Sequence, residues 1–275
     1  MCSRANIRLL DRLAPDHVAT DDGSMSFQIE RRGPIQVMIL DRPHVRNAID
    51  LDLSRAVAEA VDAAERDPDI RALVLTGSGG TFCSGMDLKA FSRGERPSIP
   101  GRGLCGITRR APRLPLIAAV EGAAVGGGFE LVLSADLVVA GESARFGMPE
   151  GRRGLVATQG GALRLPRRLP PSVAAEILLT GRFVGACEMM HFGLVNRVSK
   201  DGDALDVACD LARDVVAGAP LAIDAVLAVL RARSAPTAEE WSEQDERFKP
   251  VLVSSDAREG VLAFVHQRKP CWEGK

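Results

Sequence analysis

Apolar and polar positions change their period along the chain. Residues 27–31, "FQIER", and residues 35–41, "IQVMILD", have the short apolar patterning of two strands, which we expect to join near Gly33. From residue 47 to residue 65 the apolar residues recur at helical spacing, and this predicts a helix with Asn47 as its N-cap.

The middle of the chain repeats a strand, turn, helix, strand order. Continuous apolar runs at 70–79, 114–122 and 137–141 are typical of buried strands. Between the last two runs, residues 127–136, "GGFELVLSAD", open a helix that begins within the run of three glycines at 126–128. This alternation predicts an α/β fold with mostly buried strands.

Helical spacing dominates the last part of the chain. The expected helices lie at 170–181, 204–218, 220–232 and 237–252. We therefore predict an α/β core over residues 25–200, which carries the functional site, followed by a helical region over residues 201–275. Residues 1–24 mix charges, prolines and a polar end, so we interpret them as an extension without chemistry, and disorder is one interpretation of it.

Composition narrows the class of protein. The 275 residues include 46% hydrophobic and 26% charged residues, with a net charge of −1. This balance suits a large core and gives no electrostatic argument for nucleic acid or an anionic membrane as partner. The six cysteines are scattered without CxxC pairs, which favours free thiols in a reducing compartment, the cytoplasm, and disfavours a metal site. We expect neither a signal peptide nor a membrane span.

Two glycine-rich turns follow apolar strands, at residues 73–91 and 116–131. Glycine lets a backbone turn tightly, and the first amides of a helix have no partner inside the helix. Each turn could aim one amide at the same oxygen and so form an oxyanion hole. Close helix–strand packing explains the same glycines. Neither turn is a clean dinucleotide motif, and the lysine of a P-loop is absent.

Two glutamates lie at or after the second of these stretches. Glu130 lies in the first turn of the predicted helix, and Glu150 follows a proline in "GMPEGRRG". Glu130 could simply be stabilised by the helix dipole, and Glu150 could pair with Arg152 or Arg153 in solvent. Together they would suit proton transfer beside a carbonyl group, provided that the fold brings them together. Sequence spacing leaves this choice open.

Five motifs in order resemble the enoyl-CoA hydratase/isomerase (crotonase) family. They lie at 40–49 ("LDRPHVRNAI"), 80–91 ("GTFCSGMDLKAF"), 120–150 ("VEGAAVGGGFELVLSADLVVAGESARFGMPE"), 179–198 ("LTGRFVGACEMMHFGLVNRV") and 259–275 ("EGVLAFVHQRKPCWEGK"). The resemblance spans about residues 27–275. It implies a crotonase-like spiral of ββα units with a helical C-terminal region, which serves oligomerisation and closure over coenzyme A (CoA), in a homotrimer or a dimer of trimers.

The resemblance also implies a mechanism. The backbone amides of Met86 and Gly127 would hold the thioester oxygen of an acyl-CoA substrate. Glu130 would activate the water that adds at C3, and Glu150 would exchange the proton at C2. Because both acid positions are glutamate, the resemblance favours an enoyl-CoA hydratase, which needs no cofactor beyond its acyl-CoA substrate.

Further positions match the substrate-binding parts of the family motifs. The matched residues are Arg46, Ala48, Ser84, Asp87, Leu88, Lys89, Gly126, Pro149, Thr158, Phe264 and Arg268. For Lys89 a solvated role is the alternative, and for Phe264 simple packing is the alternative.

Departures from the family pattern keep other activities open. Ala157 stands where many hydratases have proline, and Thr158 stands where a glycine often lines the water site. Parts of the C-terminal half are similar to carnitinyl-CoA dehydratase-type members, which handle a polar acyl group. A Δ3-Δ2 isomerase is a further alternative.

The absence of tyrosine excludes family chemistries that use a tyrosine proton donor. An RNA-binding family member is a remote alternative, which the near-neutral charge and the few aromatic residues disfavour.

Overall fold

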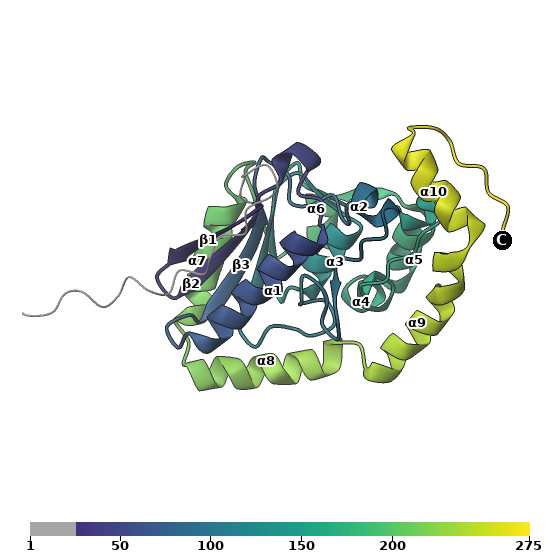
Figure 1. Cartoon of the computed structure of the whole chain (residues 1–275). Helices are drawn as coiled ribbons and strands as arrows, with labels where there is room; N and C mark the ends of the chain where they lie inside the picture. The colour runs from purple at the N-terminus through teal and green to yellow at the C-terminus, as the bar shows by residue number, and fades with distance from the viewer. Residues whose placement is uncertain (1–25) are drawn as a thin grey trace, which may run out of the picture.

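The computed structural model describes residues 26–275, so the predicted extension at 1–24 lies outside the described residues (Figure 1). A six-stranded sheet with the order β1-β2-β3-β6-β8-β11 forms its centre. The strands are β1 Phe27–Arg32, β2 Ile35–Leu40, β3 Ala72–Gly77, β6 Leu116–Val120, β8 Leu137–Gly141 and β11 Arg197–Ser199. The first two strands are antiparallel and form the predicted hairpin at Gly33, whose φ of 66° suits glycine. The other neighbours pair in parallel.

A smaller sheet lies beside the large one and has the order β10-β9-β7. Its strands are β7 Ala123–Val125, β9 Arg145–Gly147 and β10 Phe183–Gly185. Each repeating unit consists of one strand of the large sheet, one strand of the small sheet and a helix. One unit is β6, β7 and α3 (Gly127–Ser134), and the next is β8, β9 and α4 (Gly161–Arg168). These successive ββα units confirm the predicted spiral and bring the loops after β7 and β9 to neighbouring positions.

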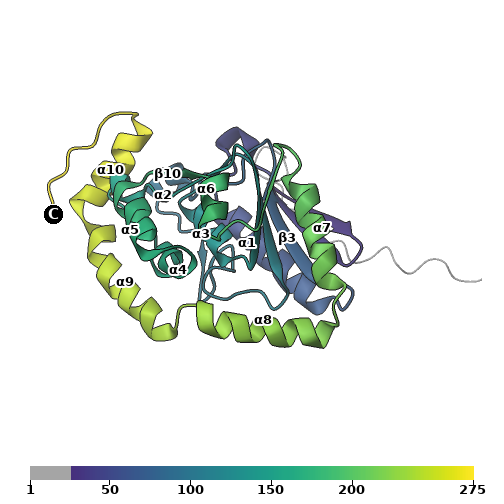
Figure 2. The same ribbon diagram turned by 180° about the vertical axis from the view of Figure 1, so that it is seen from behind.

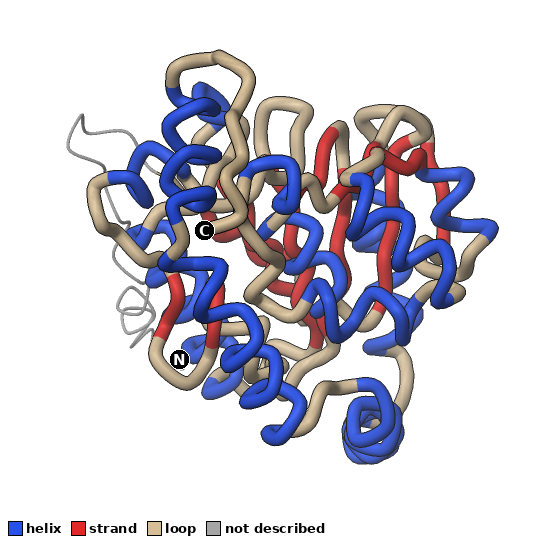
Figure 3. Tube along the Cα trace, turned by 90° about the vertical axis from the view of Figure 1, so that its right-hand side faces the viewer, coloured by secondary structure: helices blue, strands red, loops and turns tan. Residues whose placement is uncertain are grey.

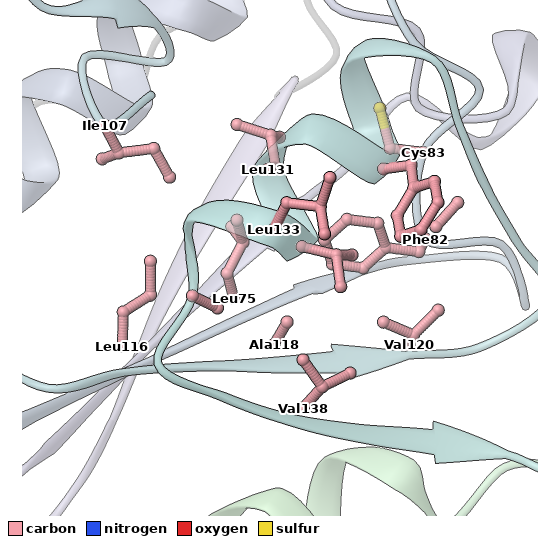
Figure 4. Close-up of a cluster of buried hydrophobic side chains, with 14 of the residues drawn as sticks. Leu75, Phe82, Cys83, Ile107, Leu116, Ala118, Val120, Leu131, Leu133 and Val138 are labelled. Carbon is pink, nitrogen blue, oxygen red and sulfur yellow. The ribbon is translucent and has the colours of Figure 1, made fainter. Parts of the chain in front are cut away.

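Both faces of the large sheet are buried, as the continuous apolar runs predict. On one face, Ala118 and Val138 of the sheet pack with Leu131 and Leu133 of α3 and with Phe82 (Figure 4). On the other face, helix α7 (Ala204–Val216) covers the strands, as Figure 2 shows from behind. Alternate residues of each strand therefore serve two different cores.

Helix α7 falls within the region 201–275 that we expected to act outside the core. Its Ala208, Cys209 and Ala212 are buried against Val74 and Ile117 of the sheet. The three helices that follow α7 do not pack on this face of the sheet. They are α8 Pro220–Ser234, α9 Ala238–Val253 and α10 Ser255–Val265. Helix α8 runs below α1 in the view of Figure 1, α9 continues along the side that carries α4 and α5 (Pro171–Thr180), and α10 lies beside α2 (Leu88–Ser92) (Figures 1 and 3).

The predicted helix at 47–65 starts later than expected. Helix α1 spans Leu51–Arg66, and its N-cap is Asp50, whose carboxylate accepts a hydrogen bond from the Leu53 amide at 2.9 Å. The prediction that Asn47 caps this helix is therefore wrong. Asn47 is buried with a φ of 54°, and its side chain donates to the carbonyls of Ser78 (2.9 Å) and Thr81 (2.7 Å). It ties two loops together instead of capping a helix.

The remaining short elements complete the described chain. They are η1 Pro43–Val45, β4 Ser98–Ile99, β5 Gly103–Leu104, η2 Glu150–Arg153 and α6 Ala186–His191. Within residues 26–275 no single helix is long and apolar enough to span a membrane. Helices α7 and α8 meet that criterion only as a pair, and the chain bends by 109° between them.

Candidate active site

A cavity of about 570 Å³ lies where the two glycine-rich turns, η2 and α9 meet. Gly85 and Met86 come from the first turn, and Gly126 and Gly127 come from the second. Glu130 and Glu150 line the same cavity. The fold therefore brings together both turns and both acids, although 20 or more residues separate some of them in the sequence.

Two backbone amides face this cavity without a protein partner. The residues around Met86 form a parallel bridge with Ile49: the Ile49 amide donates to Gly85, and the Asp87 amide donates to Ile49 (2.8 and 2.9 Å). Because amides alternate in direction along an extended segment, the Met86 amide points away from this bridge. Gly127 is the first residue of α3, so its amide has no partner within the helix. Neither amide donates a hydrogen bond to any group in residues 26–275.

The two amides lie close together because the turns are glycine. A side chain on Gly85 would bring its Cβ to 3.2 Å from the Gly127 nitrogen, and Gly85 has a φ of 97°. A Cβ on Gly127 would lie 3.5 Å from the Met86 nitrogen. The two turns therefore approach each other so closely that an added Cβ on either glycine would touch the backbone nitrogen of the opposite turn.

Glu130 lies in the first turn of α3 and is only 3% exposed. Its Oε1 accepts hydrogen bonds from the amides of Gln159 (2.7 Å) and Gly161 (2.9 Å). Its Oε2 accepts no hydrogen bond from the described residues. One oxygen of the carboxylate is thus anchored, and the other is free to meet a ligand in the cavity.

Glu150 begins the short helix η2, directly after Pro149. Its Oε2 is buried and has no hydrogen-bond partner in the described chain. A Cβ on Gly126 would lie 3.0 Å from its Oε1, and Gly126 has a φ of 54°. The second glycine turn therefore lies directly against this carboxyl group.

Burial raises the pKa of both carboxyl groups above the ordinary range for glutamate. For Glu130 the nearby Glu150 raises the pKa further, while the two loop amides and Arg164 oppose the shift. For Glu150 the charge of Arg153 opposes the shift. Raised pKa values of this kind favour the protonated carboxyl form near neutral pH, which is a property of groups that can serve as proton donors as well as acceptors.

The structure places the predicted site residues in two groups. Those that line the cavity are Ser84, Met86, Leu88, Gly126, Gly127, Glu130, Pro149, Glu150 and Thr158. Those that do not line it are Arg46, Ala48, Asp87, Lys89, Phe264 and Arg268. Whether any of these residues acts on a substrate stays a prediction.

Structural contacts occupy several residues of the second group. The Asp87 carboxylate caps α2 by accepting from the amides of Lys89 (3.0 Å) and Ala90 (3.1 Å). Arg268 pairs with Glu259 on the surface, and Lys89 is exposed. The Phe264 ring lies under the guanidinium of Arg153, 4.3 Å from its centre.

Sequence reasoning missed Arg42, which organises the first glycine turn. Its Nη1 donates to the Ala48 carbonyl (2.6 Å) and pairs with Asp50 (2.8 Å), and its guanidinium also reaches Asp87 (3.4 Å). Arg42 lies in the motif "LDRPHVRNAI", but only the folded chain shows which carboxylates it meets.

Sequence reasoning also missed the residues that hold Glu130 and those that cover the cavity. The amides of Gln159 and Gly161 carry no signal in a side-chain pattern. Phe248 and Leu252 of α9 close one side of the cavity, and their helical spacing indicates only an apolar helix face.

Comparisons with known proteins show which family this chain resembles over nearly its whole length. The model of the family described as enoyl-CoA hydratase/isomerase matches residues 30–275. A carnitinyl-CoA dehydratase from Salmonella paratyphi A is 43% identical over 262 residues, which cover 92% of this chain and 100% of that protein. The crystal structure of a carnitinyl-CoA hydratase from Mycobacterium avium has a TM-score of 0.85 at 40% identity. An enoyl-CoA hydratase from Mycobacterium tuberculosis H37Rv has a TM-score of 0.74 at 45% identity. Both structural matches cover 91% of this chain and 99% of the other.

Proposed function

Because this chain belongs to the enoyl-CoA hydratase/isomerase family, we propose that it is an enoyl-CoA hydratase that reversibly adds water across the 2,3 double bond of a 2-enoyl-CoA thioester. One observation carries the proposal: two buried carboxyl groups, Glu130 and Glu150, share a cavity with two backbone amides that have no partner in the described chain.

The proposed reaction uses these four groups together. The thioester oxygen accepts hydrogen bonds from the amides of Met86 and Gly127, which stabilise the enolate as it forms. Glu130 takes a proton from the attacking water while the water oxygen bonds to C3. The electron pair of the double bond moves toward C2 and the thioester carbonyl, and Glu150 then donates its proton to C2.

The raised pKa values of the two carboxyl groups support the presence of a carboxyl proton in this pair near neutral pH. Hydration requires one ionised and one protonated carboxyl group at the start. A pair of ordinary exposed glutamates would both be ionised at neutral pH. Burial raises the pKa of both carboxyl groups, and the charge of Glu150 raises that of Glu130 further, which favours retention of a proton on the pair. In the proposed cycle the proton must pass from Glu130 back to Glu150 after each turnover.

The same geometry serves the reverse reaction, dehydration of a 3-hydroxyacyl-CoA. The likeness to a carnitinyl-CoA dehydratase supports a substrate whose acyl chain ends in a trimethylammonium group. A Δ3-Δ2 isomerase is less well supported, because moving one double bond needs a single acid that serves C2 and C4 in turn. Here two buried acids face the cavity.

The first test is loss of the 2-enoyl thioester absorbance with the purified chain. We expect Glu130→Gln and Glu150→Gln each to lower kcat for water addition by about 100- to 10,000-fold, because each variant removes one proton-transfer group. Glu142→Gln is the matched control, since Glu142 is an exposed glutamate outside the cavity. The assay panel includes crotonyl-CoA, a longer chain, a branched chain and a trimethylammonium 2-enoyl-CoA.

Two outcomes would contradict the proposal. One is water addition that persists at the wild-type rate in both glutamine variants. The other is activity on a 3-enoyl-CoA alone, without hydration of any 2-enoyl-CoA in the panel, which would favour the isomerase.

Other features of the protein stay proposals as well. We propose assembly as a homotrimer or a dimer of trimers, which the apolar surface of α8 supports. Residence in the cytoplasm and turnover without a cofactor stay predictions.

A further inference from the structure

We propose that Arg164 is a positioning residue for Glu130, and that helix α9 holds Arg164 in place through Trp241. This inference rests on the proposed function, in which Glu130 is the base. Arg164 lies on α4 and does not line the cavity, so it can act on the reaction only through other residues.

The loop at residues 158–161 connects the two side chains. Its amides at Gln159 and Gly161 are the hydrogen-bond donors to Glu130 among the described residues. Its carbonyls are held from the other side: Arg164 Nη1 donates to the Gln159 carbonyl at 3.2 Å, and Gln244 Nε2 donates to the Thr158 carbonyl at 3.0 Å. Gln244 therefore holds the peptide unit 158–159, whose amide donates to Glu130, and Arg164 holds the next unit, 159–160, which lies between the two donor amides. Because these units are consecutive, a shift of the loop moves both donors and with them the Glu130 carboxylate.

Arg164 is built into the interior. Its residue exposure is 9%, and its Nη2 donates to the carbonyl of Thr108. The hydroxyl of Thr108 in turn contacts the Gln159 side chain, whose Oε1 accepts from the Leu104 amide at 2.9 Å. The guanidinium thus joins the loop to a second segment of the core, as a planar group with several donors can do.

Helix α9 completes this arrangement from outside. The guanidinium carbon of Arg164 lies 5.4 Å from the centre of the Trp241 ring, and that of Arg109 lies 4.4 Å from the same ring. Trp241 and Gln244 are both buried, one helical turn apart on α9. Gly160 passes between Arg164 and Trp241: its φ is 99°, and a Cβ there would lie 2.2 Å from Arg164 Nη1 and 2.7 Å from the indole. The loop, the cation and α9 are therefore packed as one unit.

Charge gives Arg164 a second effect on Glu130. The charges that shift the pKa of Glu130 are Glu150 of η2, which raises it, and Arg164 of α4, which lowers it. The pKa of Arg164 is itself lowered by the charges of Arg167 and Arg168 on the same helix. Strand β7, which also packs on α3, has no titratable residue. Burial lowers the pKa of Arg164 to about 10, so it is still a cation at neutral pH and favours the ionised form of Glu130.

The test compares Arg164→Met, Arg164→Lys, Trp241→Leu and Trp241→Phe in the full chain, with kcat, KM and the pH profile of kcat/KM as readouts. Circular dichroism melting reports whether each variant is folded. Arg247→Ala is the matched control on α9, because Arg247 is exposed and, among residues 26–275, pairs only with Glu243.

We expect Arg164→Met to lower kcat by about 10- to 100-fold with KM nearly unchanged, because a small displacement of a reacting group has effects of this size. The acidic limb of its kcat/KM pH profile should move to higher pH, because loss of the Arg164 cation disfavours the ionised form of Glu130. Arg164→Lys should keep the wild-type limb and lose part of kcat. Trp241→Leu should lower kcat, Trp241→Phe should restore most of it, and Arg247→Ala should match the wild type.

The inference is overturned if folded Arg164→Met and Trp241→Leu keep the wild-type kcat and pH limb, or if they change KM alone. If Arg164→Met does not fold, Arg164→Lys decides, and a wild-type kcat in that variant overturns the inference. Loss of activity in Glu130→Gln beside full activity in the Arg164 variants would contradict this inference alone. Full activity in Glu130→Gln would instead contradict the proposed function.

Discussion

At the scale of single residues, Glu130 and Glu150 have an environment that works against folding. A buried carboxylate lacks the hydration it has in the unfolded chain, and Glu150 Oε2 has no hydrogen-bond donor in the described residues. The folded protein therefore favours the protonated form of each acid, and this is the same property that suits the pair to proton transfer. Function and stability make opposite demands on these two residues.

The pH dependence of stability follows from the direction of these shifts. Each folded pKa lies above its unfolded value of about 4.3, so the folded state binds protons more tightly. The stability associated with these acids is fully present below the unfolded pKa and is lost as the pH rises through the folded pKa. We expect the difference in unfolding free energy, Glu150→Gln minus wild type, to increase by about 1–3 kcal/mol from pH 5 to pH 8.

Urea unfolding of both proteins at pH 5 and pH 8 measures this difference. Glu142→Gln serves as the control, because an exposed glutamate should shift stability equally at both pH values. A gap between Glu150→Gln and the wild type that stays constant with pH would show that Glu150 is ordinarily ionised in the folded protein.

At the scale of elements, the contact between α10 and η2 holds the loop that carries Glu150. Two glycines make this contact possible. A Cβ on Gly260 of α10 would lie 1.9 Å from the Arg153 carbonyl oxygen, and a Cβ on Gly154 would lie 2.2 Å from the Asp256 carbonyl oxygen. Backbone therefore packs directly on backbone, and the position of η2 depends on α10.

We expect Gly260→Ala to push α10 away from η2, because a Cβ cannot occupy that space. The expected cost is about 1–3 kcal/mol of unfolding free energy, typical of overpacking, together with lower kcat from displacement of Glu150. Denaturant unfolding and the hydration assay measure the two effects. Gly185→Ala is the matched control, since no atom lies within 4 Å of its added Cβ and its φ is −82°. Equal stability and activity in the two variants would contradict this account.

At the scale of the whole molecule, helix α8 exposes several large apolar side chains to solvent. They are Leu221, Val226, Val229 and Leu230, each more than half exposed. Because several large apolar side chains exposed on one helix are typical of an interaction site, they support the proposed assembly of several copies of this chain.

Light scattering after size-exclusion chromatography tests this assembly. We expect the wild type to have a mass that is a multiple of 29.3 kDa, by three or six, and Val226→Glu with Val229→Glu to shift it toward a single chain. A charged side chain in an apolar interface loses its hydration without gaining a partner. Arg55→Glu, at an exposed position of α1, should leave the mass unchanged. A wild-type mass of one chain would exclude the proposed trimer.

The sequence by itself determined the periodic elements, the glycine turns and the residue types at the site. Apolar runs specify buried strands because both faces of the sheet must be covered, and the three glycines before Glu130 signal a backbone that approaches another chain segment. Sequence did not decide which residues meet. Asp50, not Asn47, caps α1 because its carboxylate reaches the Leu53 amide, and α7 belongs to the sheet because its alanines fit against the strands.

Only the tertiary structure brought Glu130 and Glu150 to one cavity and placed the loop amides, Arg164 and α9 behind Glu130. These relations depend on parallel strands that set separate loops side by side, and on backbone amides that any residue type supplies. A one-dimensional pattern records the chemistry of each side chain. It does not record which amides and charges surround a carboxyl group after folding, and those neighbours set its pKa.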